Sequence, residues 1–126
     1  MNKKIKKILL KKNKYKIVSL TAYSKSIAKI LDKFCDIILV GDSMANVLYG
    51  CKNTNKMTLN NKMTLNNIIQ HTLSVRKGTK NSLLVADMPK NTYKNQSAAE
   101  KNAKLIMKET GCDAVKLESN NKNFKI

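Results

Sequence analysis

Four short apolar segments alternate with three stretches of helical periodicity along the chain, and this alternation limits the possible folds more than any other feature. The apolar segments, each with the length of a β-strand, are residues 16–23, 36–43, 82–88 and 113–118. The helical stretches between them are residues 24–34, 66–78 and 97–111. Strands joined through helices pair in parallel, so the sequence predicts an α/β fold with a parallel sheet covered by helices.

Residues that cap helices support these boundaries. Ser24 is suited to cap the first helical stretch, and Ser97 with Glu100 has the spacing of a capping box at the start of the third. Gly111 is placed to end the third helix. In the first stretch, one face carries a set of apolar residues that is typical of a face turned to the core, namely Ile27, Ile30, Leu31 and Phe34.

The first 15 residues predict a short N-terminal helix or arm. Ile5, Ile8 and Leu9 share one helical face, and we expect the helix to pack on the body of the protein. A helix lying on a membrane surface is the alternative. The apolar part is too short for a signal peptide, and no segment approaches the roughly 18 apolar residues of a membrane span, so we expect no membrane partner.

The formal net charge of +17 raises the possibility of a nucleic-acid partner. The 25 basic residues are 24 lysines and a single arginine, Arg76, and they accompany 16 asparagines. Arginine is the residue that favours bidentate recognition of phosphates and guanines, whereas a bias towards Lys and Asn codons explains both enrichments. We therefore keep a basic nucleic-acid-binding protein as an alternative and not as the leading hypothesis.

The cysteines indicate a reducing compartment. Cys35, Cys51 and Cys112 are odd in number and widely spaced, without a C-x-x-C motif. This pattern predicts neither a disulfide framework nor a zinc site, and it favours a cytoplasmic location.

Polar side chains stand at the ends of the predicted strands. Asp42 and Ser43 follow the second strand, Asp87 ends the third, and Lys116 and Glu118 lie on the fourth. Because the carboxyl ends of parallel strands about 4.8 Å apart meet at one edge of a sheet, the three carboxylates can converge. Such a cluster without His or Cys favours Mg²⁺, and a nearby lysine suits an anionic substrate. A single aspartate in such a place can also cap a helix, so the prediction depends on the whole set.

Five ordered motifs extend the interpretation. They read LTAYS, ILVGDSM, TLNNIIQHTLSVRKG, LLVADMP and GCDAVKLE, and the match covers about residues 17–118. Together they resemble the ketopantoate hydroxymethyltransferases, and the resemblance implies the first half of a (β/α)8 TIM-type barrel. It also implies an Mg²⁺-dependent transfer of a hydroxymethyl group from 5,10-methylenetetrahydrofolate to 3-methyl-2-oxobutanoate. The product, 2-dehydropantoate, belongs to pantothenate and coenzyme A biosynthesis.

The resemblance also implies roles for individual residues. Metal ligands are expected at Asp42, Asp87 and Glu118, and contacts to the keto acid are expected from Asp42, Ser43, Asp87 and Lys116. The proposed general base of the family is a glutamate in the second half of the barrel, beyond this chain, so no catalytic residue is assigned. His71 matches a family histidine on a helix, and we expect a packed or capped residue there and not a catalytic one.

The sequence departs from the family pattern at several places, one of which is Ser24, where the family has Asp after LTAY. The hexapeptide NKMTLN at residues 55–60 recurs at 61–66, which lengthens the loop before the second helical stretch. The family's PFGSY has become PKNTY at residues 89–93, so that Lys90 and Asn91 replace Phe and Gly. A pair of glycines after the last glutamate has become Ser119 and Asn120, which puts a close backbone approach in doubt.

We therefore expect a single incomplete barrel domain over residues 1–126. Its expected parts are an N-terminal helix or arm at 1–15, four parallel strands with three helices at 16–118, and a truncated tail at 119–126. We expect the chain to be inactive alone and to need a complementary C-terminal half chain, whereas full-length members of the family form homo-oligomers. A non-catalytic remnant is the second alternative.

Overall fold

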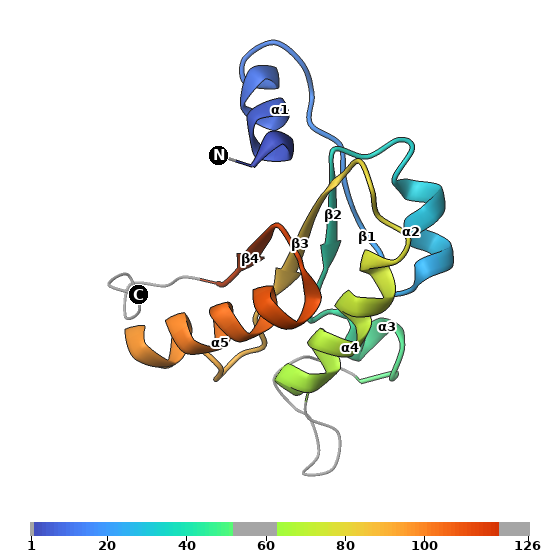
Figure 1. Ribbon diagram of the computed structural model, residues 1–126. Coiled ribbons are helices and arrows are strands. Elements are labelled where there is room, and N and C mark those ends of the chain that lie inside the picture. The colour runs from blue at the N-terminus through green and yellow to red at the C-terminus, as the bar shows by residue number, and fades with distance from the viewer. Residues whose placement is uncertain (1, 52–62, 119–126) are drawn as a thin grey trace.

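The computed structural model describes residues 2–51 and 63–118 of the protein, and it contains one parallel sheet with the strand order β1-β2-β3-β4 (Figure 1). The strands are β1 Ser19–Thr21, β2 Ile37–Val40, β3 Leu83–Asp87 and β4 Ala114–Lys116. The helices are α1 Lys3–Lys11, α2 Lys25–Leu31, α3 Met44–Val47, α4 Leu65–Arg76 and α5 Gln96–Thr110. This order confirms the predicted α/β fold, with the topology of the first half of a (β/α)8 barrel.

The sheet is covered on one face. Figure 1 shows α2, α4 and α5, the helices that connect consecutive strands, together on the same side of the sheet. The fully buried strand residues that face them are Ile38, Val40, Leu84 and Ala86. Leu39 and Val85 alternate onto the opposite face and are only half-buried. In a barrel this second face is the inner one, so within the described residues it stays partly exposed.

The apolar face of α2 is not buried as expected. Ala28 is the buried residue of this helix, and Leu31 is half-buried. The exposed apolar residues on and just after the helix are Ile27, Ile30 and Phe34. The pattern correctly predicted a helix, but this face lies at the β1 edge of the sheet, where the described residues provide nothing to cover it.

Most helix ends follow from capping. The Ser24 hydroxyl accepts a hydrogen bond from the Ile27 N–H at 3.5 Å, as predicted for the start of α2. Gly111 ends α5 with a φ of 64°, which a glycine adopts without strain. α4 begins after Thr64, one residue earlier than expected, because Thr64 and Asn67 form a capping box.

The predicted capping box at Ser97 and Glu100 is wrong. Asn95, two residues earlier, accepts a hydrogen bond from the Ala98 N–H at 2.9 Å, so α5 begins at Gln96. The four-residue helix α3 was not predicted, since it lies in a stretch without helical periodicity. Most of the duplicated hexapeptide, as well as Ser119 and Asn120, lies outside the described residues.

Asp32, just after α2, holds the chain where it enters β3. Its carboxylate accepts hydrogen bonds from the backbone N–H groups of Lys80, Asn81 and Ser82 at 2.8–3.0 Å. Burial raises the pKa of this carboxyl, but the backbone hydrogen bonds outweigh that effect and hold the pKa below its usual value. The ionised carboxylate of Asp32 therefore stabilises the segment that leads into β3.

α1 is attached at the same end of the sheet, where the strands begin (Figure 1). Lys11 Nζ lies 2.6 Å from Asp36 Oδ1, and Lys4 Nζ lies 3.2 Å from Asp113 Oδ2. Asn2 Nδ2 also donates a hydrogen bond to Asp113, at 2.7 Å. These contacts confirm that the helix packs on the body of the protein, and they show that ion pairs hold it there.

Apolar contacts add less to the attachment of α1. Ile5 and Ile8 are half-buried, Leu9 is exposed, and no residue of the helix is fully buried. Among the helices in residues 2–51 and 63–118, none has the length and apolar character needed to cross a membrane.

The eight acidic residues of the chain are not spread evenly. The three that lie where strands begin are Asp32, Asp36 and Asp113, and the three that lie where strands finish are Asp42, Asp87 and Glu118. Glu100 and Glu109 lie on α5. The first set binds backbone N–H groups and lysines of α1. The second set therefore contains the acidic residues that are candidates for a ligand-binding site.

Candidate active site

The predicted site residues lie at the end of the sheet where the strands finish. Asp42 and Ser43 follow β2, Asp87 is the last residue of β3, and Lys116 is the last residue of β4. Asp87 and Lys116 are partners in the register of the two strands. The structure brings them into contact, because Lys116 Nζ lies 2.7 Å from Asp87 Oδ2.

Asp87 is the most deeply buried of these residues, with 3% of its surface exposed. Its Oδ2 atom is bound by Lys116, but its Oδ1 atom is buried and has no hydrogen-bond partner among the described residues. A buried carboxylate oxygen without a partner costs free energy. Asp87 therefore offers an unsatisfied acceptor, which is the property expected of a ligand to a cation.

Asp42 lies within the electrostatic reach of the other two carboxylates. Burial raises the pKa of the Asp42 carboxyl above its usual value, and the negative charges of Asp87 and Glu118 raise it further. The positive charge of Lys116 and the backbone N–H of Ser43 oppose this effect without cancelling it. Carboxylates that repel one another in this way are stabilised together when a divalent cation binds between them.

Lys116 lies between two of the acids. Its Nζ atom is 2.7 Å from Asp87 and 3.7 Å from Glu118 Oε1. Burial lowers the pKa of Lys116, but the hydrogen bond to Asp87 and the surrounding negative charges outweigh that effect and raise the pKa above its usual value. The ammonium group is therefore charged at neutral pH, and its side chain is still 41% exposed.

The donor set fits Mg²⁺ with two protein carboxylates, from Asp42 and Asp87. Mg²⁺ prefers oxygen ligands and usually takes only one or two carboxylates, with water or substrate completing the shell. In residues 2–51 and 63–118, no three His, Cys, Asp or Glu side chains are already arranged to hold one ion. The carboxylate of Glu118 lies 3.7 Å from Lys116 Nζ. Its role as a third ligand of the metal stays a prediction.

Two tyrosines at the site were not assigned from the sequence. The hydroxyl of Tyr23, just beyond β1, lies 2.9 Å from Ser43 Oγ. The hydroxyl of Tyr93 accepts a hydrogen bond from the backbone N–H of Glu118, and its pKa is raised by burial and by the three nearby carboxylates. Tyr23 stands inside the LTAYS motif and Tyr93 ends the PKNTY segment, but an aromatic residue near a strand end usually indicates packing, so no sequence signal marked them.

His71 lies in α4 and contacts the residues around the site. Its Nδ1 atom is 2.9 Å from the backbone oxygen of Tyr23, and its Nε2 atom is 3.1 Å from the hydroxyl of Tyr49. The rings of Tyr49 and His71 meet edge to face, with centroids 6.4 Å apart. The expectation of a packed histidine is confirmed, and both ring nitrogens are engaged.

The turn before Tyr93 tolerates its departure from the family pattern. Asn91 stands where that pattern has glycine, and it adopts a φ of 74°. Asparagine enters this left-handed region more readily than other residues with a side chain. The Thr92 N–H donates to the Pro89 carbonyl at 3.0 Å, which closes the turn.

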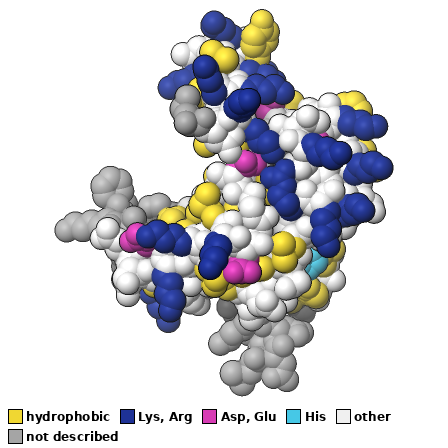
Figure 2. All heavy atoms as spheres, in the orientation of Figure 1, with side chains coloured by type: hydrophobic (Ala, Val, Ile, Leu, Met, Phe, Trp, Pro, Cys, Tyr) yellow, Lys and Arg dark blue, Asp and Glu magenta, His cyan; other side chains and the backbone are white. Residues whose placement is uncertain are grey.

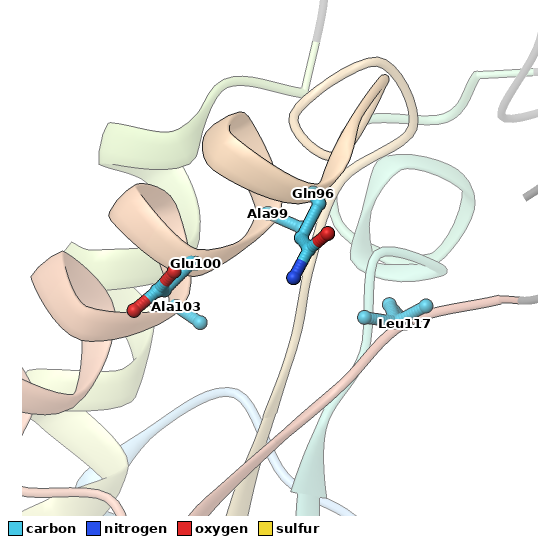
Figure 3. Close-up of a pocket in the computed structure, with 5 residues that line it drawn as sticks. All are labelled: Gln96, Ala99, Glu100, Ala103 and Leu117. Atoms are coloured by element: carbon cyan, nitrogen blue, oxygen red, sulfur yellow. The ribbon is translucent and has the colours of Figure 1, made fainter. Parts of the chain in front are cut away.

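An open pocket lies between α5 and the residue that follows β4 (Figure 3). It is lined by Gln96, Ala99, Glu100, Ala103 and Leu117. None of these is a predicted site residue, and the small alanines give the pocket an apolar floor. The pocket therefore belongs to the packing surface of α5 and not to the carboxylate cluster.

Lysine side chains cover much of the visible face, most densely over its upper and right-hand parts (Figure 2). Figure 2 shows Lys and Arg side chains from the upper part of the molecule, over α1, to its lower part, near α5. Several lysines are committed to acidic partners, among them Lys4, Lys11, Lys104 and Lys116. A nucleic-acid interface calls for a basic surface that is free to contact phosphates, so this pairing with acids does not favour the nucleic-acid alternative.

Comparison with known proteins identifies similar chains. A sequence model of the family described as ketopantoate hydroxymethyltransferase matches residues 2–126. The 3-methyl-2-oxobutanoate hydroxymethyltransferase of Pelagibacter ubique is 53% identical over 126 residues, which are 100% of this chain and 47% of that protein. The enzymes of the same name from Anaplasma marginale and Brucella canis are 46% and 45% identical, over 88% and 81% of this chain and 38% and 35% of those proteins. The chain thus spans less than half the length of these relatives.

Proposed function

Because the chain belongs to the ketopantoate hydroxymethyltransferase family, we propose that it forms the part of such a transferase that binds the metal and the keto acid. The reaction would transfer a hydroxymethyl group from 5,10-methylenetetrahydrofolate to 3-methyl-2-oxobutanoate and yield 2-dehydropantoate for pantothenate and coenzyme A biosynthesis. One observation supports this proposal most directly. The buried Oδ1 of Asp87, which has no partner among the described residues, lies in a cluster with Asp42 and Lys116 at the carboxyl end of the sheet.

The metal would be held by Asp42 and Asp87, with Glu118 as the predicted third ligand. When bound, Mg²⁺ supplies Lewis-acid stabilisation of negative charge on the oxygens of the keto acid. Asp42 has to lose its proton before it can act as a ligand, and its raised pKa makes that loss dependent on pH. Asp87 contributes the buried oxygen that has no other partner among the described residues.

The keto acid would be bound by residues around this position. Lys116, charged and partly exposed, would neutralise the substrate carboxylate. The hydroxyl of Ser43, held by Tyr23, would donate a hydrogen bond to a substrate oxygen. These contacts fix the substrate with C3 free to lose its proton, and none of the described residues is assigned as the base that removes it.

The remaining parts of the site would come from strands and helices other than the described ones. β1 and β4 each pair with a single strand in the described part of the chain, and apolar residues are exposed at the β1 edge. We propose that strands five to eight, from a longer polypeptide or from a complementary chain, supply the base and the folate pocket. Cys35 and Cys112 are buried free thiols, which suits the cytoplasmic location that we propose.

The test is exchange of the C3 proton of 3-methyl-2-oxobutanoate for deuterium, followed by NMR with Mg²⁺ present. The chain is assayed alone and together with a fragment that carries strands five to eight of the Pelagibacter ubique relative. We expect exchange only with the fragment, and turnover when methylenetetrahydrofolate is added. Asp87→Asn should abolish exchange, whereas Glu109→Gln, which alters an exposed acid on α5, should leave it unchanged.

Two results would contradict the proposal. Fast exchange by the chain alone, lost in Asp42→Ala, would show that a residue of this chain acts as the base. No exchange with the fragment, despite a folded complex, would favour the non-catalytic remnant.

A further inference from the structure

A series of hydrogen bonds connects α4 to the candidate site. The hydroxyl of Tyr49 lies 3.1 Å from His71 Nε2, and His71 Nδ1 lies 2.9 Å from the backbone oxygen of Tyr23. The side chain of the same tyrosine then reaches Ser43, with 2.9 Å between the two hydroxyl oxygens. His71 thus contacts the main chain of a residue whose side chain touches the site.

The partners of His71 define where its proton lies. A backbone carbonyl can only accept a hydrogen bond, so Nδ1 must carry the proton that it donates to the Tyr23 oxygen. In the neutral ring, Nε2 then accepts, and the hydroxyl of Tyr49 is the donor. The protein therefore requires the Nδ1–H tautomer, which is the less favoured form of a histidine side chain in water.

We propose that His71, as the Nδ1–H tautomer, is a positioning residue of the site. It fixes the main chain just beyond β1, which keeps the Tyr23 hydroxyl against Ser43, and Tyr49 holds the ring in the orientation that this contact needs. The inference rests on the proposed function in one respect, namely that Ser43 contacts the keto acid. His71 itself is not assigned a contact with the substrate.

The first test reads the tautomer directly. His71 is the single histidine of the sequence, so a long-range ¹H–¹⁵N correlation spectrum of the full chain shows one imidazole. We expect the nitrogen shifts of an Nδ1–H ring in the spectrum of the neutral imidazole. Tyr49→Phe should retain that tautomer, because the Tyr23 carbonyl imposes it. An Nε2–H ring, or averaging between the two tautomers, overturns the proposal.

The second test separates positioning from packing with a matched pair of variants. In His71→Asn the amide nitrogen lies near the position of Nδ1 and can still donate to Tyr23, whereas in His71→Gln it lies near Nε2 and can reach only Tyr49. We expect the amide resonance of Ser43 to move in the Gln variant and to stay in the Asn variant. The affinity for 3-methyl-2-oxobutanoate with Mg²⁺, measured by calorimetry, should fall about threefold to tenfold in the Gln variant alone, as for one lost hydrogen bond.

The outcomes distinguish this inference from the proposed function. Equal effects of both variants on the Ser43 resonance would show that His71 only fills space, and would overturn the positioning role. The expected tautomer and the expected difference between the variants, without any keto-acid binding by the unaltered chain, would support the positioning role and contradict the proposed function.

Discussion

Lys116 Nζ lies 2.7 Å from Asp87 Oδ2, and this pair joins the ends of two neighbouring parallel strands. The contact uses one oxygen of Asp87 and leaves the other buried without a partner among the described residues. A carboxylate in this state is stabilised further when a cation binds to its second oxygen. The side chain of Lys116 is partly exposed, so it can still contact an anion. In the proposed function, this pair would therefore link the binding of Mg²⁺ to the binding of the keto acid.

Binding of Mg²⁺ should strengthen as the pH rises through the range in which Asp42 ionises. Burial, Asp87 and Glu118 raise the pKa of Asp42, so the proton competes with the metal to a higher pH than at an exposed aspartate. Calorimetric titrations from pH 4 to 7 should show this increase. Asp42→Asn should weaken binding by at least about tenfold, since even changes outside the ligand shell cost that much. An equal affinity for Mg²⁺ at all these pH values would contradict the role of Asp42 as a metal ligand. Glu100→Gln, which alters an exposed acid on α5, is the control and should leave the affinity unchanged.

Replacement of Lys116 should affect a neighbouring acid as well as the substrate. Lys116→Gln removes the positive charge that lowers the pKa of Asp42, so that pKa should rise further. Carbon-13 NMR titration of the carboxyl group measures this shift. The affinity for the keto acid should fall about tenfold or more, as for a lost charge-assisted hydrogen bond. Lys104→Gln, on the exposed face of α5, should change neither quantity.

Asp32 should make the protein sensitive to acid. The pKa of Asp32 is lower in the folded than in the unfolded chain. Its contribution to the free energy of unfolding is therefore complete at a pH above the pKa of the unfolded chain, and it disappears as the pH falls through the pKa of the folded protein. Asp32→Asn should reduce the free energy of unfolding at pH 7 by about 2 kcal/mol. Urea denaturation at pH 7 and pH 3 should show a smaller loss on acidification in the variant. The same loss in both proteins would show that other groups, such as Asp36 and Asp113, account for the acid sensitivity.

Gly78 should tolerate no side chain. A Cβ atom at this position would lie 2.4 Å from the Lys25 backbone oxygen and 2.9 Å from the Ala28 Cβ, so α2 and the end of α4 would have to separate. Gly78→Ala should lower the free energy of unfolding by about 1–3 kcal/mol. Gly50→Ala is the comparison, because no atom lies within 4 Å there and only a φ of +64° opposes the substitution. A smaller cost at Gly78 than at Gly50 in the same denaturation experiment would contradict the close packing.

The order of elements and the meeting of the main site residues could be predicted because both follow from periodicity. Four strands joined by helices pair in parallel, and their carboxyl ends then share one edge, where Asp87 and Lys116 meet. The start of α5 was predicted wrongly because Asn95 and Ser97 are both good caps, and the choice between them depends on the turn that precedes the helix. Spacing alone contains no information on that turn.

Other features depend on contacts between distant segments. Whether the apolar face of α2 is covered is decided by neighbouring elements, so Phe34 can fit the helical pattern and still be 73% exposed. The place of Tyr23 at the site depends on a hydrogen bond to Ser43, 20 residues away, and no local pattern marks it. Asn91, which stands where the family pattern has glycine, adopts a φ of 74°, a left-handed conformation that its neighbours in the sequence do not predict.

The division of the acidic residues between the two ends of the sheet has a practical consequence for engineering. Asp36 and Asp42 are six residues apart, which corresponds to roughly 20 Å of extended chain. Substitutions at such separations usually add independently. Variants that improve acid tolerance at the strand starts can therefore be selected in one library and variants that change ligand preference at the strand ends in another. The two sets can then be combined without a further round of optimisation.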